Sequence, residues 1–202
     1  MADRTTGVTW FRAPTDDDPG TLNACYNALD IHVVRGHADD VAIDLDGSAR
    51  SFARLLTEVA ACAGVLRAFG ADVGHQVAVG VVPQETGVVV LLAAARVGAV
   101  AQYDDSPGAV GTVVVRGTPD GVVLTAEGED LPWDVAMRAG RTDPAGCADV
   151  PGDAVLSRHA GDTLTVLAAL GASDDHDLPV PAGATLVEVG GLRFWSFDAP
   201  QR

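Results

Sequence analysis

Residues 76–103, QVAVGVVPQETGVVVLLAAARVGAVAQY, decide the fold class of this chain. The valine-rich run at 76–82 predicts a strand that is buried on both faces. A helix is predicted from about Gln84 to Arg96, with Gly98 as its stop, and a second short strand follows over residues 99–103. A strand, a helix and a strand within about thirty residues predict a βαβ unit with a right-handed crossover and parallel strands. We therefore expect an α/β fold.

The segments before this unit predict two helices and a strand pair. A first helix is expected to begin near Thr21, because apolar side chains recur at helical spacing up to Gly36. Ser51 is expected to cap a longer helix, which Gly70 closes. Alternation of apolar and polar residues over 41–45, followed by Asp-Gly, predicts a hairpin or short strand pair. The stripe of the first helix consists of Leu22, Cys25, Leu29 and Val33.

The second half favours hairpins over further crossover helices. Two apolar runs flank the turn residues 117–121, and two more flank Gly190-Gly191, which predicts hairpins over 111–126 and 184–197. A short helix is expected over 133–139. The remaining segments are a polar stretch at 141–153, a helix or a strand at 162–170, and an acidic loop at 173–177. We expect two regions, residues 1–105 and residues 106–202, that pack together as one compact unit.

The charge of the chain excludes several classes of function. Its 202 residues include 28 Asp+Glu against 13 Lys+Arg, a formal net charge of −15. Nucleic acids and anionic membranes are gripped by cationic side chains, so neither is an expected partner. All 13 basic residues are arginine. Without lysine, this chain cannot supply a Schiff-base lysine or the lysine of a phosphate-binding loop.

The remaining composition points to a cytoplasmic protein without a resident metal or cofactor. The first residues are polar, and the longest apolar run, 87–100, is interrupted by Arg96 and is too short to span a bilayer. Cys25, Cys62 and Cys147 are odd in number and lie far apart, without a CxxC pair. They predict neither a disulfide framework nor a zinc site, and we expect three reduced thiols.

Four blocks of the first hundred residues form a recognisable series. They are Trp10-Phe11, Gly20–Asp30, Ser51–Ala63 and Val97–Val100. In order and spacing they resemble the N-terminal part of the AMP-forming acyl-CoA synthetases, most of all the acetyl- and propionyl-CoA synthetase branch. The motif Leu-Asn-x-x-Tyr-Asn-x-Leu-Asp at 22–30 is the most specific. The resemblance implies a synthetase-type N-terminal subdomain.

The resemblance also implies where the chemistry of the family has been lost. The family's phosphate loop corresponds to Ser157–Thr163, which here has one glycine, an aspartate and no lysine after it. A loop that cradles phosphates needs several glycines and a cation. At Gln102–Asp105, two aspartates stand where the family accepts CoA. We therefore expect no adenylation activity from this chain alone and assign no catalytic residue.

Four residues are candidates for contact with an anionic ligand. Arg138 and Arg141 resemble a pair that some acetyl-CoA synthetases place on the 3′-phosphate of CoA, although two solvated arginines at a helix end would look the same. Arg158 is the cation available to the degenerate loop. His159, near Asp162, could act as an acid or base, or could be a surface histidine without a function.

These observations leave three functional hypotheses. The first is a non-catalytic synthetase-like binding or regulatory subunit for a protein partner in acyl or CoA metabolism. The second is a small-molecule module for CoA, acyl groups or nucleotides, and the third is one half of a split synthetase. Aromatic residues on both faces of 194–197 must be covered by the chain's own core, by a second copy in a homodimer, or by a protein partner.

Overall fold

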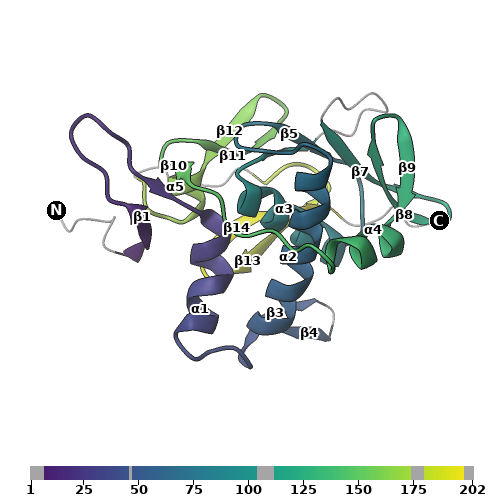
Figure 1. Ribbon diagram of the computed structural model, residues 1–202, viewed down its shortest axis with the longest axis horizontal. Coiled ribbons are helices and arrows are strands. Elements are labelled where there is room, and N and C mark those ends of the chain that lie inside the picture. Colours follow the sequence, from purple (N-terminus) through teal and green to yellow (C-terminus); the bar gives the residue numbers. More distant parts are fainter. Residues whose placement is uncertain (1–6, 46, 104–111, 174–179, 198–202) are drawn as a thin grey trace.

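The fold is built on a seven-stranded sheet whose four neighbouring strands β11, β6, β5 and β7 run parallel, in the order β12-β11-β6-β5-β7-β8-β9 (Figure 1). The computed structural model describes residues 7–45, 47–103, 112–173 and 180–197. The strands of this sheet are β5 (Gln76–Val79), β6 (Val100–Tyr103), β7 (Val113–Thr118), β8 (Gly121–Ala126), β9 (Glu129–Pro132), β11 (Val155–His159) and β12 (Asp162–Thr165). The mixed α/β class predicted from the sequence is confirmed.

The βαβ unit forms as expected, with helix α3 (Gln84–Val97) between the parallel strands β5 and β6. Gly98 ends the helix in the left-handed conformation, with φ of 78°. Strand β5 is shorter than the predicted 76–82. Beyond Val79 the chain still bonds to the next strand, since Gly80 N donates to Val115 O at 2.9 Å.

Three helices form a layer against the sheet, and α2 (Phe52–Ala68) lies between α3 and α4 (Trp133–Gly140) (Figure 1). Ser51 caps α2 as predicted, because its side chain accepts from Arg54 N at 3.4 Å. Glycines permit the close approach of α2 and α4. A Cβ on Gly140 would lie 2.0 Å from Ala61 O, and one on Gly64 would lie 2.2 Å from Asp143 O.

The helix predicted from Thr21 begins later than expected. Thr21 and Leu22 form a strand, and the helical segment starts after Asn23, whose Oδ1 accepts from Tyr26 N at 3.1 Å. The side chain of Asn23 thus takes the place of a helix cap, which the apolar spacing did not reveal. The elements here are β1 (Trp10–Arg12), β2 (Thr21–Leu22), the π-helical segment η2 (Tyr26–Asp30), α1 (Ile31–Val34) and β10 (Val150–Pro151), with β2 between β1 and β10.

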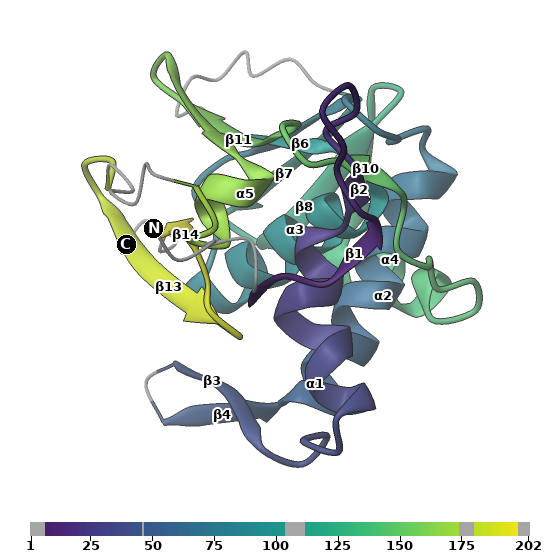
Figure 2. The same ribbon diagram turned by 90° about the vertical axis from the view of Figure 1, so that its left-hand side faces the viewer.

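Two further hairpins lie apart from the main sheet (Figure 2). They are β3 (Val41–Leu45) with β4 (Ser48–Ser51), and β13 (Ala184–Val189) with β14 (Leu192–Phe197). The second turns at Gly190 and Gly191, whose φ values of 55° and 88° fit the predicted two-residue turn. The hairpin predicted over 111–126 is also present, as β7 and β8.

The undecided segment 162–170 contains both kinds of element, because strand β12 is followed directly by helix α5 (Val166–Ala169). Most of the acidic segment 173–177 and the expected boundary near residue 105 lie outside the described residues. Among the described residues, no helix is long and apolar enough to cross a lipid bilayer.

Candidate functional site

Arg138 and Arg141 lie together in one pocket between α2, α3 and α4, with a volume of about 400 Å³. Arg138 is exposed and pairs with Asp134 one turn earlier, with Nη2 and Oδ2 3.3 Å apart. The pocket also contains carboxylates, so it offers groups of both signs. Its lining residues are Glu58, Glu85, Thr86, Val89, Trp133, Asp134, Met137, Arg138 and Arg141.

A further arginine, Arg50, pairs with two of the carboxylates that line this pocket. Arg50 of β4 forms ion pairs with Glu85 and, at 3.9 Å, with Glu58. The Nε atom of Arg50 is buried, and no described residue forms a hydrogen bond with it. An anionic group entering the pocket would therefore meet Arg138 and Arg141, together with two carboxylates that are already engaged with Arg50.

Arg158 and His159 lie elsewhere, so the four predicted ligand residues form two separate pairs. Both are in β11, near one edge of the sheet, whereas α4 packs against β8 and β9 at the opposite edge. Arg158 is exposed. In the sheet it lies opposite Thr163 of β12 on one side and Gln102 of β6 on the other. The two pairs do not surround one ligand-sized space.

The segment 157–163, where the phosphate loop was predicted, is an antiparallel hairpin. Strand β11 turns into β12 at Ala160 and Gly161, with φ of 48° and 93°, and His159 lies opposite Asp162. Backbone groups in such a ladder bond to neighbouring strands instead of pointing together at a phosphate. The hydroxyl of Ser157 is fully buried here and has no hydrogen-bond partner.

Aromatic side chains of β14 lie where the parallel strands β6 and β11 end. Tyr103, the last residue of β6, is buried and donates from its hydroxyl to Trp195 O at 3.0 Å. Its ring meets Trp195 edge-on at 5.6 Å between centroids, and Phe197 lies 5.2 Å away. Burial raises the pKa of Tyr103 above its ordinary value. The ring of His159, at the end of β11, also lies near these two side chains, with its centroid 6.2 Å from that of Trp195 and 6.1 Å from that of Phe197.

This aromatic cluster matters because ligands of open α/β sheets bind beyond the carboxyl ends of the parallel strands. In the described part of the chain, aromatic residues of β14 lie close to the last residues of two of these strands, Tyr103 of β6 and His159 of β11. Phe194, Trp195 and Phe197 are all buried, so the chain's own core covers both faces of the aromatic stretch.

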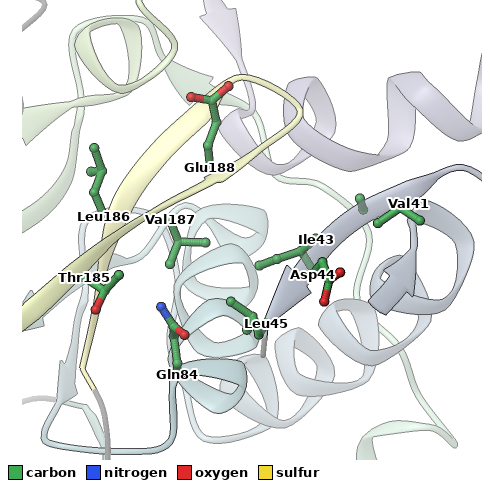
Figure 3. Close-up of a pocket in the computed structure, with 10 residues that line it drawn as sticks. Val41, Ile43, Asp44, Leu45, Gln84, Thr185, Leu186, Val187 and Glu188 are labelled. Atoms are coloured by element: carbon green, nitrogen blue, oxygen red, sulfur yellow. The ribbon is translucent and has the colours of Figure 1, made fainter. Parts of the chain in front are cut away.

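A groove of about 480 Å³ lies between the two isolated hairpins (Figure 3). Ile43 and Leu45 of β3, Val187 of β13 and Gln84 at the start of α3 point into it, while Glu188 points away from it. Among the described residues, β3 pairs only with β4, and β13 only with β14. The groove is therefore bordered by two strands that each have one unpaired edge.

The comparisons with known proteins place these features in a family context. No family model matches the chain. An acetyl-coenzyme A synthetase of Streptomyces avermitilis is 36% identical over 115 residues, which cover 48% of this chain and 18% of that protein. An acetyl-coenzyme A synthetase of Shewanella sp. strain ANA-3 is 33% identical over 151 residues, 70% of this chain and 21% of that protein.

The chain is acyl-CoA-synthetase-like, of the AMP-forming type. It spans about a fifth of the length of the relatives it matches. Two crystal structures share the fold of the synthetase-like chain. Apo MatB from Rhodopseudomonas palustris matches with a TM-score of 0.51 and 17% identity over 74% of this chain and 36% of its own. VinN matches with a TM-score of 0.51 and 16% identity, over 68% of this chain and 39% of its own.

The motif at 22–30 of the synthetase-like chain serves to join distant segments. The Asn23 amide donates to the backbone oxygens of Ala95, Arg96 and Ala148, each at 3.0 Å. Asn27 exchanges hydrogen bonds with the backbone of Thr9, at 2.7 and 3.1 Å. The most specific block of the resemblance therefore positions the N-terminal arm and the end of α3, and it supplies no group to either candidate pocket.

Sequence reasoning missed a polar cluster at the centre of the synthetase-like chain. Arg96, noted only as an interruption of an apolar run, is 7% exposed and donates to Asp30 at 2.8 Å and to Ala145 O at 2.7 Å. Burial alone would lower the pKa of Arg96, but the hydrogen bond to Asp30 outweighs it and raises the pKa. A lone arginine within an apolar helix was the available signal, since such a charge is rarely buried without a partner.

Proposed function

We propose that this synthetase-like chain is a non-catalytic subunit that binds a protein partner of acyl or CoA metabolism through the groove between β3 and β13. The observation that carries the proposal is the pair of unpaired strand edges at this groove. Exposed strand edges readily accept another strand, and proteins without such a use usually cover them.

The arrangement around residues 157–163 supports the non-catalytic part of the proposal. The segment expected to form the phosphate loop is a hairpin in which Asp162 lies opposite His159, and the rings of Trp195 and Phe197 lie near His159. A nucleotide would have to displace a buried aromatic cluster and approach a carboxylate. Both steps are unfavourable.

The shape of the groove favours an extended polypeptide as its occupant. Side chains of a strand alternate between its two faces, so every second residue of an added strand would face Ile43, Leu45 and Val187. The rims carry the exposed carboxylates of Asp44 and Glu188. The complementary segment has apolar side chains directed inward and basic side chains directed outward.

Charge favours a different protein over a second copy of this chain. Each copy carries a formal net charge of −15, so two copies repel each other. A partner segment rich in lysine or arginine would be attracted to the same surface. We therefore commit to a basic, extended segment of another protein, and self-association is an outcome that the test must distinguish.

Charge reversal at the rims tests the proposal. An Asp44→Lys/Glu188→Lys variant, a matched Asp120→Lys control at the exposed β7–β8 turn and the original chain would each be incubated with a peptide of alternating valine and lysine. Isothermal titration would give affinity, and hydrogen exchange would locate the protected amides. We expect binding with protection of β3 and β13, retention in the control and at least about a tenfold loss in the rim variant.

Two results would contradict this function. One is equal binding by the rim variant and the original chain, and the other is a stable dimer at micromolar concentration by light scattering whose formation protects β3 and β13. A peptide of alternating valine and glutamate serves as the ligand control, and its binding with equal affinity would remove the electrostatic argument.

A second candidate function is supported by the shared pocket of Arg138 and Arg141. Arginine forms bidentate contacts with phosphate, and this pocket of about 400 Å³ could receive part of CoA or a nucleotide. Thermal unfolding with CoA, acetyl-CoA, AMP or ATP at a hundred times the dissociation constant would show about 2.7 kcal/mol of added stability. Loss of that shift in Arg138→Ala/Arg141→Ala would support this function, and no shift with any of the four would exclude it.

A further inference from the structure

Two of the three cysteines are brought to one ion pair by the fold, although they lie far apart in the sequence. Cys25 stands directly before η2, and Cys147 lies in the loop that leads to β10. Arg96 Nη1 donates to Cys25 Sγ at 3.7 Å, and Cys147 Sγ donates to Asp30 Oδ2 at 3.8 Å. The same Arg96 nitrogen and Asp30 oxygen are 2.8 Å apart.

The two thiols therefore lie against the two members of one buried ion pair. A hydrogen bond with Cys25, together with burial, raises the pKa of Cys147 above its ordinary value. The charged groups that face this pair are Arg96 from α3 and Asp30 from η2. All three cysteines are free thiols in this structure, as the sequence predicts.

The pair differs from Cys62 in its access to solvent. Cys25 is fully buried, but Cys147 is partly exposed and lines a surface pocket of about 240 Å³. A small oxidant can therefore reach Cys147 first. Cys62 is enclosed within α2 and lies outside this cluster. The other residues lining the pocket are Arg67, Ala71, Asp72, Val97, Gly146 and Ala148.

We propose that Cys25 and Cys147 form a redox-active dithiol that a peroxide converts to an intramolecular disulfide. In the first step the sulfur of Cys147 attacks one peroxide oxygen, the O–O bond breaks, and hydroxide leaves and takes up the thiol proton as water. In the second step the sulfur of Cys25 attacks Cys147, the S–S bond forms, and the S–O bond breaks with release of water. Two thiols are oxidised by two electrons, and hydrogen peroxide is reduced to two water molecules.

The neighbouring charges have defined roles in these steps. The guanidinium of Arg96 donates to the sulfur of Cys25 and so orients it for the second step. Asp30 holds the thiol proton of Cys147 through the hydrogen bond, and so orients this sulfur. Because the thiolate is the nucleophile and the pKa of Cys147 is raised, the first step is slow at neutral pH and accelerates with rising pH.

Peptide mapping of the whole chain after hydrogen peroxide treatment tests this proposal. Non-reducing digestion should yield one linked peptide that joins Cys25 to Cys147, with Cys62 recovered as a thiol after unfolding. The rate of its formation should rise about tenfold for each pH unit between pH 6 and 8. The oxidised chain should also unfold at a higher temperature than the reduced one, and added dithiothreitol should reverse that shift.

Three cysteine variants distinguish a paired reaction from general oxidation. Cys25→Ser should leave a sulfenic acid on Cys147 that dimedone labels, whereas Cys147→Ser should abolish both the linkage and the labelling. Cys62→Ser is the matched control and should form the link at the original rate. Linkage through Cys62, dimers joined between chains, or dimedone labelling of the unmutated chain without any Cys25–Cys147 link would overturn the proposal.

Discussion

The guanidinium of Arg96 and the carboxylate of Asp30 lie 2.8 Å apart in the interior, where their side chains are 9% and 16% exposed. The pair joins α3 to η2, and Arg96 extends the connection to the loop at Ala145. A buried charge left without its partner is costly, so the structure depends on both members together.

Removal of one member of this pair should destabilise the fold strongly. We expect Arg96→Met to lower the free energy of unfolding by about 3–5 kcal/mol in urea titrations, and Asp30→Asn/Arg96→Met to lower it less, because no unpaired charge remains. Arg138→Met at an exposed ion pair is the control and should lie within about 0.5 kcal/mol of the original. If the losses of Asp30→Asn alone and Arg96→Met alone add up to the loss of the double variant, the two residues act independently.

The close contact between α2 and α4 gives a second prediction. In Gly140→Ala the new methyl group would meet Ala61 O, and we expect a loss of about 1–3 kcal/mol in the free energy of unfolding. In Gly146→Ala the new methyl group would have no neighbour within 4 Å, so the free energy of unfolding from urea titrations should change little. If both variants unfold alike, the two helices are not packed as closely as described.

Stability should fall at alkaline pH because of Cys62. Burial raises the pKa of this thiol from 9.0 to about 12, while in the unfolded chain it keeps its ordinary value. Between pH 9 and 12 the unfolded state therefore binds fewer protons than the folded state, and stability declines as pH rises, by about 1.4 kcal/mol per pH unit. Cys62→Ala should show a shallower decline in urea titrations across this window, and an unchanged slope would contradict the assignment.

Asn23 should not tolerate an acidic replacement. The Asn23→Asp carboxylate would face the carbonyl oxygens of Ala95, Arg96 and Ala148 without a proton to donate. We expect a loss of about 2 kcal/mol or more at pH 7, since buried acceptors would be left unsatisfied. The deficit should shrink below pH 5, where the carboxyl group gains a proton, and circular dichroism melts over pH 4–8 would measure it.

The hydroxyl of Tyr103 holds the C-terminal hairpin at the sheet. Tyr103→Phe leaves Trp195 O without this donor and should cost about 1–2 kcal/mol in the free energy of unfolding. Tyr26→Phe, at a partly exposed ring beside Phe11, is the matched control. Similar losses in both variants would mean that the hydrogen bond contributes little.

Local patterns predicted the helices and hairpins well, because each depends on neighbouring residues. Ser51, Gly98 and Gly190-Gly191 act within a few residues of their position, and the structure confirms all three. The start of the first helix was wrong, because the side chain of Asn23 and the pairing of Leu22 with β10 decide it. Such pairing joins segments far apart in sequence and leaves no periodic signal.

The candidate site was less predictable for the same reason. Spacing placed Arg138 and Arg141 at one helix end, and the structure shows that they share a pocket, but spacing could not show that Arg158 and His159 lie near the other edge of the sheet. The groove between β3 and β13 arises from hairpins separated by most of the chain. The roles of the four candidate residues remain predictions.

The aromatic side chains of β14 also constrain the order in which this chain matures on the ribosome. Tyr103 leaves the exit tunnel long before Trp195 and Phe197, so the apolar surface around its ring stays uncovered until the C-terminal hairpin has been translated. Apolar surface that waits in this way attracts chaperones and other nascent chains. Synthesis that stalls before residue 194 should therefore yield a product prone to aggregation, even though the βαβ unit and its helices are complete.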